Sequence, residues 1–222
     1  MKIAVWNLER PKLNQKRIRP ILEKLRSLDA DILILTETNS AINPGSDFNS
    51  ITSEKLGEKT DGIDYSEGEN RTTIWTKFEI AEKIETCDNF TTVCAKLKTP
   101  VGELIVYGCI TGIFGGIGQR FKSDFENQSS DWKKFAPGAN ICIAGDFNTM
   151  LSGHAYPSKM ARNDFLDICE KLDLEIPTKE IPRNVDHIFI SRKMVLGKNI
   201  GVEIWNEDFL WSDHIGILIS IS

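Results

Sequence analysis

The sequence predicts a single α/β domain, covering residues 1–222, built on mixed β-sheets. Its length of 222 residues fits one large domain with a substantial core. Its N-terminal part reads as strand, helix and strand, a pattern that gives adjacent parallel strands joined by a right-handed crossover. Later strand-like runs are separated by turn signals, which predict hairpins. Hairpins make the sheet arrangement mixed rather than purely parallel.

The first elements follow from hydrophobic periodicity. Residues 2–8 form an apolar run that predicts a buried strand, and residues 31–36 (DILILT) predict a second. Between them, apolar residues recur at helical spacing, so we expect an amphipathic helix over about 14–28. Pro20 fits this helix if it begins near residue 17, because proline is tolerated in a first turn.

The rest of the chain is predicted in the same way. The polar stretch 38–68 is expected to be a long loop with little regular structure. Helices are expected over 119–135 and over 158–172, the second with Ser158 as its cap. The turn signal TPVG at 99–102 predicts a hairpin between two of the strands. The strands are expected at 72–76, 81–86, 91–97, 103–111, 140–144, 185–191, 202–205 and 215–221.

The composition limits the protein class. The 27 Lys and Arg residues against 32 Asp and Glu give a net charge of −5, which argues against a dedicated DNA-binding module. The five cysteines form no CxxC pair, so we expect reduced core thiols rather than a zinc site. No signal peptide or membrane span is visible, which predicts a cytoplasmic protein with no membrane association. No obligatory protein partner is evident.

Polar side chains lie at the ends of several apolar runs. Strand ends on a shared sheet edge bring distant positions together, and ligands bind at such edges in α/β sheets. Carboxylates gathered there repel one another, and a cation relieves that repulsion. The residues are Asn7 after IAVW, Glu37 after DILILT, Asp146 and Asn148 after ICIAG, Asp186 before HIFIS, and Asp213 and His214 before IGILIS.

Each of these residues taken alone also has a purely structural explanation. Asn7 fits a turn cap, Glu37 fits the solvated start of a loop, and the Asp146 segment fits an ordinary turn. Asp213 fits turn chemistry before a strand. His187 neighbours Asp186, but strand alternation points it away from that carboxylate, so we interpret it as a core or surface histidine. The convergence of the whole set favours a functional site.

The motifs WNLE, TE after a buried strand, GDFN, VDHIFIS and SDH occur in this order from residue 7 to residue 214. In this combination the chain resembles the endonuclease/exonuclease/phosphatase superfamily. The resemblance implies a four-layered α/β sandwich, with two packed mixed sheets flanked by helices. It also implies a Mg²⁺-dependent hydrolase of phosphoric esters, with Mn²⁺ as a substitute cofactor.

The resemblance further implies a role for each matched residue. Glu37 is expected to be the main metal ligand, with Asn7 and Asp213 in or beside the metal shell. Asp146, assisted by Asn148, is expected to activate the attacking water. Asp186 is expected to orient His214, which contacts or protonates a phosphoryl oxygen. Oxygen ligands of this kind suit Mg²⁺, and phosphate attack depends on positioning and charge neutralisation.

One part of the family pattern is missing. Many members carry a second histidine at the end of the strand after the TPVG-like turn, a slot at about 109–111, and abasic-site enzymes carry a tyrosine there. Here Tyr107 lies two residues early and Thr111 is a weak substitute. Arg120 and Arg71 are the candidate phosphate contacts, although a solvated arginine is an equally simple interpretation of Arg120. The glycine-rich segment 112–118 matches no phosphate-loop signature and reads as a flexible loop.

Three functions therefore remain open. The first is a nuclease that hydrolyses phosphodiester bonds of nucleic acid. The second is a phosphatase or phosphodiesterase of a small phosphate ester, favoured by the missing histidine and the acidic balance. The third is a non-catalytic binding protein on the same fold, against which the retained set of carboxylates and His214 argues.

Overall fold

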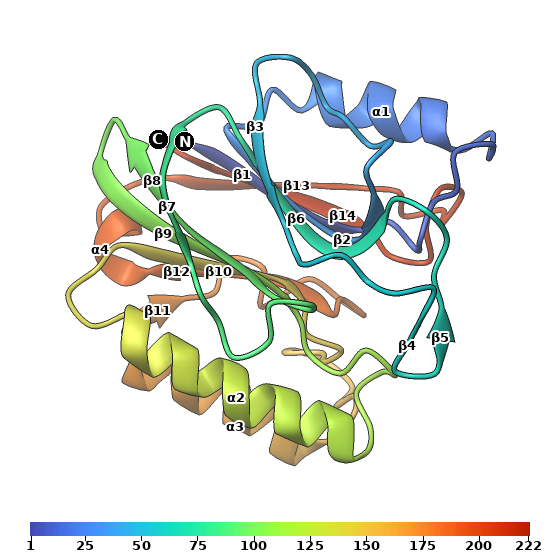
Figure 1. The fold of residues 1–222 in the computed structure, drawn as a ribbon. Helices are drawn as coiled ribbons and strands as arrows, with labels where there is room; N and C mark the ends of the chain where they lie inside the picture. Colours follow the sequence, from blue (N-terminus) through green and yellow to red (C-terminus); the bar gives the residue numbers. More distant parts are fainter.

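Two six-stranded mixed sheets pack face to face in this computed structural model, which describes residues 1–222 (Figure 1). The first sheet has the order β13-β14-β1-β2-β6-β3 and the second β11-β12-β10-β9-β8-β7. The first sheet contains β1 (Lys2–Asn7), β2 (Ile32–Asn39), β3 (Asn49–Thr52), β6 (Glu69–Thr76), β13 (Ile200–Trp205) and β14 (Gly216–Ile221). The second contains β7 (Glu79–Ile84), β8 (Val93–Thr99), β9 (Gly102–Ile110), β10 (Ile141–Asp146), β11 (Leu174–Glu175) and β12 (Asp186–Ser191).

Helices cover the outer faces of both sheets, which confirms the predicted four-layered sandwich. Helix α1 (Ile18–Ser27) packs on the first sheet, and α2 (Gln119–Phe135) and α3 (Lys159–Lys171) pack on the second (Figure 1). A short helix, α4 (Arg192–Val195), follows β12. Pro20 lies in the first turn of α1, and Ser158 caps α3 by accepting a hydrogen bond from the amide of Ala161 at 3.0 Å.

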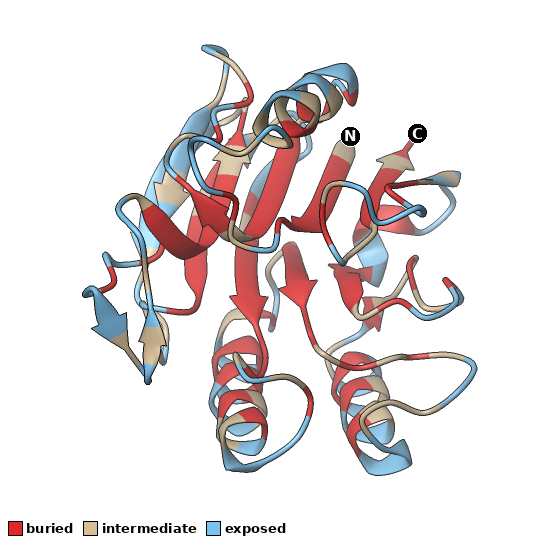
Figure 2. Cartoon of the chain, turned by 90° about the vertical axis from the view of Figure 1, so that its right-hand side faces the viewer, coloured by how far each residue is buried: buried red, intermediate tan, exposed pale blue.

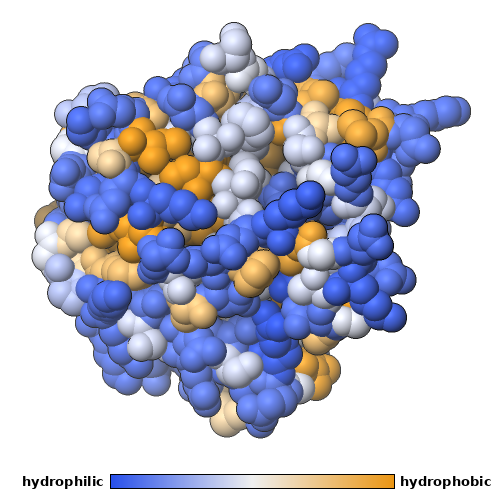
Figure 3. All heavy atoms as spheres, viewed as in Figure 1, coloured by the Kyte–Doolittle hydropathy of each residue, from blue (hydrophilic) through white to orange (hydrophobic).

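Three apolar clusters hold the layers together. One lies between the sheets and includes Ile34 and Val106, one joins α1 to the first sheet, and one joins α2 and α3 to the second. On the face shown in Figure 3, hydrophilic residues cover most of the surface and hydrophobic residues gather in smaller patches. This separation follows from burying apolar area and leaving charged side chains in water. None of the helices combines the length and the hydrophobicity needed to cross a membrane.

The stretch 38–68, predicted to be a long loop with little regular structure, contains three short strands. This segment contributes the edge strand β3 and a two-stranded arm made of β4 (Lys59–Thr60) and β5 (Ile63–Asp64). The turn of the arm is Asp61-Gly62, and both residues have positive φ, at 53° and 78°. An Asp-Gly pair is a strong signal for a tight hairpin. The prediction failed because the flanking strands are only two residues long and carry no alternating apolar pattern.

The connections of the two sheets bring the ends of several strands to one edge of the sandwich. Strand β1 runs parallel to β2, with Asn7 opposite Thr36, and β10 pairs antiparallel with β12, with Asp146 opposite Asp186. This edge lies on the right in Figure 1 and faces the viewer in Figure 2. The close pairing of β9 and β10 requires glycine at 145, since a Cβ there would lie 1.8 Å from the carbonyl oxygen of Cys109.

Candidate functional site

Asn7 connects two carboxylates that come from different sheets. Its amide nitrogen donates to Glu37 Oε1 at 3.2 Å and to Asp146 Oδ2 at 3.1 Å. Its amide oxygen accepts from the backbone N–H of Glu9 at 2.9 Å. The side chain of Asn7 is fully buried, so these contacts fix its orientation. Asn7 therefore joins the end of β1 to the ends of β2 and β10.

Asn148 holds the other side of the Asp146 carboxylate. Its backbone N–H donates to Asp146 Oδ1 at 2.9 Å, and its amide nitrogen lies 3.3 Å from Asp146 Oδ2. The same nitrogen donates to the carbonyl oxygens of Thr111 and Gly112 at 3.2 and 3.1 Å. Asp146 is thus held by donors on both oxygens and cannot rotate freely.

Asp186 and His214 form a close pair at the same edge. Asp186 Oδ2 lies 2.5 Å from His214 Nδ1, and the carboxylate is almost completely buried. The carbonyl oxygen of His214 accepts from Trp6 Nε1 at 3.1 Å and from Asn206 Nδ2 at 2.7 Å. His214 Nε2 then lies 4.0 Å from Asp146 Oδ2. This distance is too long for a direct hydrogen bond and leaves room for an oxygen atom that contacts both groups.

The electrostatics of the site follow from burial and from the crowding of like charges. The pKa of Asp146 is raised to about 6, chiefly by burial and also by Asp186, against the opposing effect of His214. Burial is also the largest cause of the raised pKa of Glu37, and Asp146 and Asp213 add to it. The pKa of His214 is lowered by burial, but Asp186, Asp146 and Asp213 outweigh this effect and raise it to about 11. His214 is therefore an imidazolium at neutral pH.

The donor set at this edge fits a divalent cation on the Glu37 side. Asp146, Asp186 and His214 have ligand atoms within 4.8 Å of one another, but a protonated imidazole has no lone pair for a metal. Glu37 and Asp146 are oxygen donors that share Asn7 as a neighbour, and the Asp146 carboxylate adds to the burial that raises the pKa of Glu37. A cation there would stabilise both ionised forms, and hard cations such as Mg²⁺ prefer these ligands.

Two of the ten non-glycine residues with positive φ belong to this site. Glu37 and Asn148 both have φ of 46°, in the left-handed region that residues with a Cβ rarely adopt. A hydrogen bond of 2.8 Å from the backbone N–H of Arg10 to the carbonyl oxygen of Glu37 holds the Glu37 backbone in this conformation. Such conformations cost about 1–3 kcal/mol each and cluster at functional sites.

The structure places two of the expected substrate contacts inside the protein. Tyr107 is fully buried among the side chains that face α2 and α3, and its hydroxyl donates to Asp131 Oδ2 at 3.0 Å. Thr111 is also fully buried, and its hydroxyl donates to Gln128 Oε1 at 2.6 Å. Both side chains are used inside the protein. Cys109 shares the buried face with Tyr107, so this face of β9 points toward the helices and not toward the site.

The two arginines proposed as phosphate contacts are engaged with carboxylates. Arg120 pairs with Asp124 at 2.7 Å, Asp88 at 3.0 Å and Asp61 at 3.2 Å. Arg71 is buried and pairs with Asp61 at 2.8 Å. These ion pairs already neutralise both guanidinium groups. The arginines connect the β4–β5 arm to the body of the domain, and a direct phosphate contact by either one stays a prediction.

His187 is a core histidine that is kept neutral. Its Nε2 donates to the carbonyl oxygen of Thr149 at 3.0 Å, and its Nδ1 lies 3.1 Å from the hydroxyl of Thr178. Burial lowers its pKa from 6.5 to about 4. The unfolded chain therefore binds a proton at this residue below about pH 6.5, whereas the folded protein does so only below about pH 4.

This difference predicts a loss of stability in acid. We expect His187 to contribute a decrease of about 3 kcal/mol in the free energy of unfolding as the pH falls from 6.5 to 4. The His187→Gln variant removes that contribution, so its stability should fall less over this window. Urea unfolding at pH 7 and pH 4.5 measures, for each protein, how much the free energy of unfolding changes between the two pH values. An equal change in the wild-type protein and in the variant would show that His187 is not a source of the acid sensitivity.

Sequence reasoning missed Asn184, which fixes Asp186. Its amide oxygen accepts from the backbone N–H of Asp186 at 3.0 Å, and its amide nitrogen donates to the Asp186 carbonyl oxygen. Asn184 is buried. The sequence signal was the spacing Asn184-Val185-Asp186, since an asparagine side chain often accepts a hydrogen bond from the backbone N–H two residues further along the chain.

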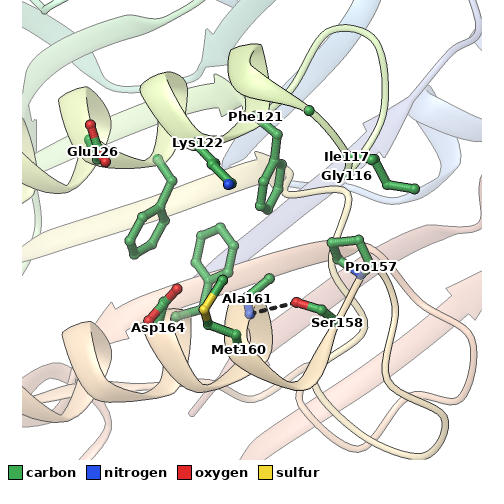
Figure 4. Close-up of a pocket in the computed structure, with 13 residues that line it drawn as sticks. Gly116, Ile117, Phe121, Lys122, Glu126, Pro157, Ser158, Met160, Ala161 and Asp164 are labelled. Carbon is green, nitrogen blue, oxygen red and sulfur yellow. Dashed lines mark hydrogen bonds between the residues drawn. The ribbon is translucent and has the colours of Figure 1, made fainter.

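A large cavity lies away from this site. It has a volume of about 530 Å³ and lies between the N-terminal halves of α2 and α3, where Phe121, Lys122 and Met160 are among the lining residues (Figure 4). The carboxylates that surround Asn7 do not line this cavity. We therefore assign the chemistry to the charged cluster and not to this cavity.

Comparison with known proteins shows the family of the chain. Residues 4–214 match the sequence model described as the Endonuclease/Exonuclease/phosphatase family. The sequence matches no curated protein. Among solved structures, the chain is similar to the endonuclease domain of TRAS1, a telomere-specific non-LTR retrotransposon, with 16% identity and a TM-score of 0.72 over 99% of this chain and 97% of that one.

Two further structures show the same level of similarity. The 3′ phosphatase NExo from Neisseria, bound to product DNA hairpin, has 16% identity and a TM-score of 0.72 over 100% of this chain and 99% of that one. The human Nocturnin catalytic domain with bound sulfate has 17% identity and a TM-score of 0.72 over 100% and 93%. At these identities the likeness establishes the fold, and it leaves the substrate to be argued from the site.

Proposed function

Because the chain belongs to the endonuclease/exonuclease/phosphatase family and is a hydrolase of phosphoester bonds, we propose that it is a Mg²⁺-dependent nuclease. The observation that carries the proposal is the convergence of Glu37, Asp146 and the Asp186–His214 pair around Asn7 at one sheet edge. A binding module has no need of such a set.

Glu37 is the main ligand in this proposal, with Asp213 beside it. Asp213 is 66% exposed in its side chain and lies 3.8 Å from His214 Nε2, so it borders the mouth of the site. Asn7 turns its amide nitrogen toward the carboxylates, and we therefore revise its role from metal ligand to positioning residue. When bound, Mg²⁺ supplies Lewis-acid polarisation of the phosphoryl oxygen and charge neutralisation for the leaving oxygen.

Asp146 positions the attacking water. It stays ionised beside the imidazolium of His214, so it accepts a hydrogen bond from water and orients the oxygen lone pair toward phosphorus. The donors from Asn7 and Asn148 prevent the carboxylate from turning away. His214 offers its Nε2–H to a phosphoryl oxygen, and Asp186 holds the ring through Nδ1. The chain thus contributes positioning and charge stabilisation, which phosphoryl transfer chiefly requires.

The second candidate is a phosphatase or phosphodiesterase of a small phosphate ester. The site favours it at one point, because Arg120 and Arg71, the candidate contacts for a long phosphate backbone, are already paired with carboxylates. Assays with Mg²⁺ on DNA, RNA and a panel of small phosphate esters distinguish the two. Salt-sensitive cleavage of an oligonucleotide supports the nuclease.

Metal dependence tests the proposal. EDTA should abolish hydrolysis, and Mg²⁺ or Mn²⁺ should restore it. Glu37→Gln removes a negative ligand without changing its size, so we expect Mg²⁺ affinity to fall by at least about tenfold, equivalent to about 1.4 kcal/mol. Isothermal titration measures the affinity directly. Glu79→Gln is the matched control, since Glu79 is exposed and pairs with Lys98 at the edge of the second sheet. Unchanged affinity in Glu37→Gln would remove Glu37 from the metal site.

A further inference from the structure

A smaller cavity opens directly beside Glu37. Its volume is about 280 Å³, and its walls come from the end of β9, from β6 and from the β4–β5 arm. Binding sites for small molecules usually span about 300–1,000 Å³. The cavity therefore has the size for one compact group next to the proposed metal ligand.

The β4–β5 arm forms a fixed far wall of this cavity. Ile63 and Tyr65 of the arm line it. Asp61 at the tip of the arm accepts from Arg71 at 2.8 Å and from Arg120 at 3.2 Å, and Arg71 Nε donates to the Tyr65 hydroxyl at 3.0 Å. In Figure 2, which faces the catalytic edge, the arm stands to the left of the strand ends. A chain that leaves the metal site in this direction meets the arm.

The polar wall of the cavity has one unused acceptor. The Glu69 side chain is only 2% exposed, and its Oε2 accepts from Arg10 at 2.7 Å. Its Oε1 is buried without any hydrogen-bond partner. A buried carboxylate oxygen without a donor is costly, so a hydroxyl group of a ligand in the cavity would stabilise it.

The rest of the lining combines apolar side chains with arginines. Ile110 and Ile113 line the cavity at the end of β9 and just beyond it, and the Arg10 and Arg71 guanidinium groups lie 4.7 and 5.4 Å from the centroid of the Tyr65 ring. Aromatic and apolar walls of this kind accept the face of a planar ring, and contacts between a base and an aromatic side chain tolerate any base. One ligand group that combines a planar ring with hydroxyl donors is a nucleoside.

We propose that this cavity binds a single terminal nucleoside of the substrate. A sugar hydroxyl donates to Glu69 Oε1, and the base packs on Tyr65 and the isoleucines. The inference rests on the proposed function, since Glu37 then places the phosphate at the mouth of the cavity. Because the arm closes the far side, the enzyme acts at a chain end or on a mononucleotide ester and not within closed circular DNA.

Two chromogenic esters test this proposal with Mg²⁺ present. One is the 4-nitrophenyl ester of uridine 5′-monophosphate, and the other is 4-nitrophenyl methyl phosphate, which has no nucleoside. Tyr65→Ala should raise KM for the uridine ester by about tenfold and leave KM for the methyl ester unchanged. Tyr65→Phe retains the ring and should stay near wild type. Asp64→Asn is the matched control, because Asp64 is an exposed neighbour on the arm whose side chain does not line the cavity.

Three results would overturn the proposal. One is an equal change of KM for both esters in Tyr65→Ala, and another is a wild-type enzyme that nicks closed circular plasmid as fast as it shortens linear DNA. The third comes from calorimetric titration with uridine 5′-monophosphate and Mg²⁺, if wild type and Tyr65→Ala bind it equally. The titration needs no turnover. Inactivity on every phosphoester would therefore contradict the proposed function, and the titration would still test whether the cavity binds a nucleoside.

Discussion

Replacing Asp146 with asparagine should lower kcat/KM by at least about 10²-fold, the scale of losing one positioned acid–base group. Asparagine keeps the shape of the side chain but removes the negative charge that accepts from water. Its amide nitrogen would also face the donors of Asn7 and Asn148, which now bond the carboxylate at 3.1 and 3.3 Å. The loss should appear in kcat, because the interaction is made chiefly in the transition state.

The control for this variant is Asp167→Asn, an exposed aspartate on α3. It makes the same chemical change away from the site and should retain full activity. Thermal unfolding of both variants shows whether the fold is intact. An Asp146→Asn enzyme that turns over at the wild-type rate would remove Asp146 from the mechanism.

Removing the His214 imidazole should cost a similar factor. His214→Ala eliminates the cation that faces the phosphoryl oxygen, and we expect kcat to fall by at least about 10²-fold. The same change leaves the buried Asp186 without its partner at 2.5 Å, and breaking a buried ion pair costs about 3–5 kcal/mol. His214→Gln is therefore the second variant, since it keeps a donor near Asp186 but cannot become a cation.

His154→Ala is the matched control, because His154 is an exposed histidine in the loop after β10. Single-turnover kinetics of His214→Gln at a temperature where it is fully folded separates chemistry from stability. A His214→Gln enzyme with the wild-type single-turnover rate would mean that the positive charge has no catalytic role.

The sequence predicted the central cluster because its members lie at or next to the ends of buried apolar runs. Hydrophobic runs can be recognised locally, and the residue after such a run must lie near the sheet edge. For this reason Glu37, Asp146 and Asp186 could be grouped without any knowledge of the strand order. The bounds of α2 were predictable for a similar reason, since its aromatic residues repeat at helical spacing.

The layer that each face of β9 contacts could not be predicted in the same way. Alternation shows that Tyr107 and Cys109 share one face, but it does not show which layer that face meets. The structure turns this face toward Trp132 of α2, which lies 6.2 Å from the Tyr107 ring. The partners of Arg71 and Arg120 were also hidden, because the tip of the arm at Asp61 is distant from Arg120 in sequence.

The central claim is that a divalent cation binds at the Glu37 carboxylate, within the group that Asn7 holds together. Soaking a crystal in Mn²⁺ and recording anomalous diffraction tests it most directly. We expect one peak within coordination distance of a Glu37 oxygen and none at His214. A peak between Asp186 and His214, or no peak near Glu37 at saturating Mn²⁺, would contradict it.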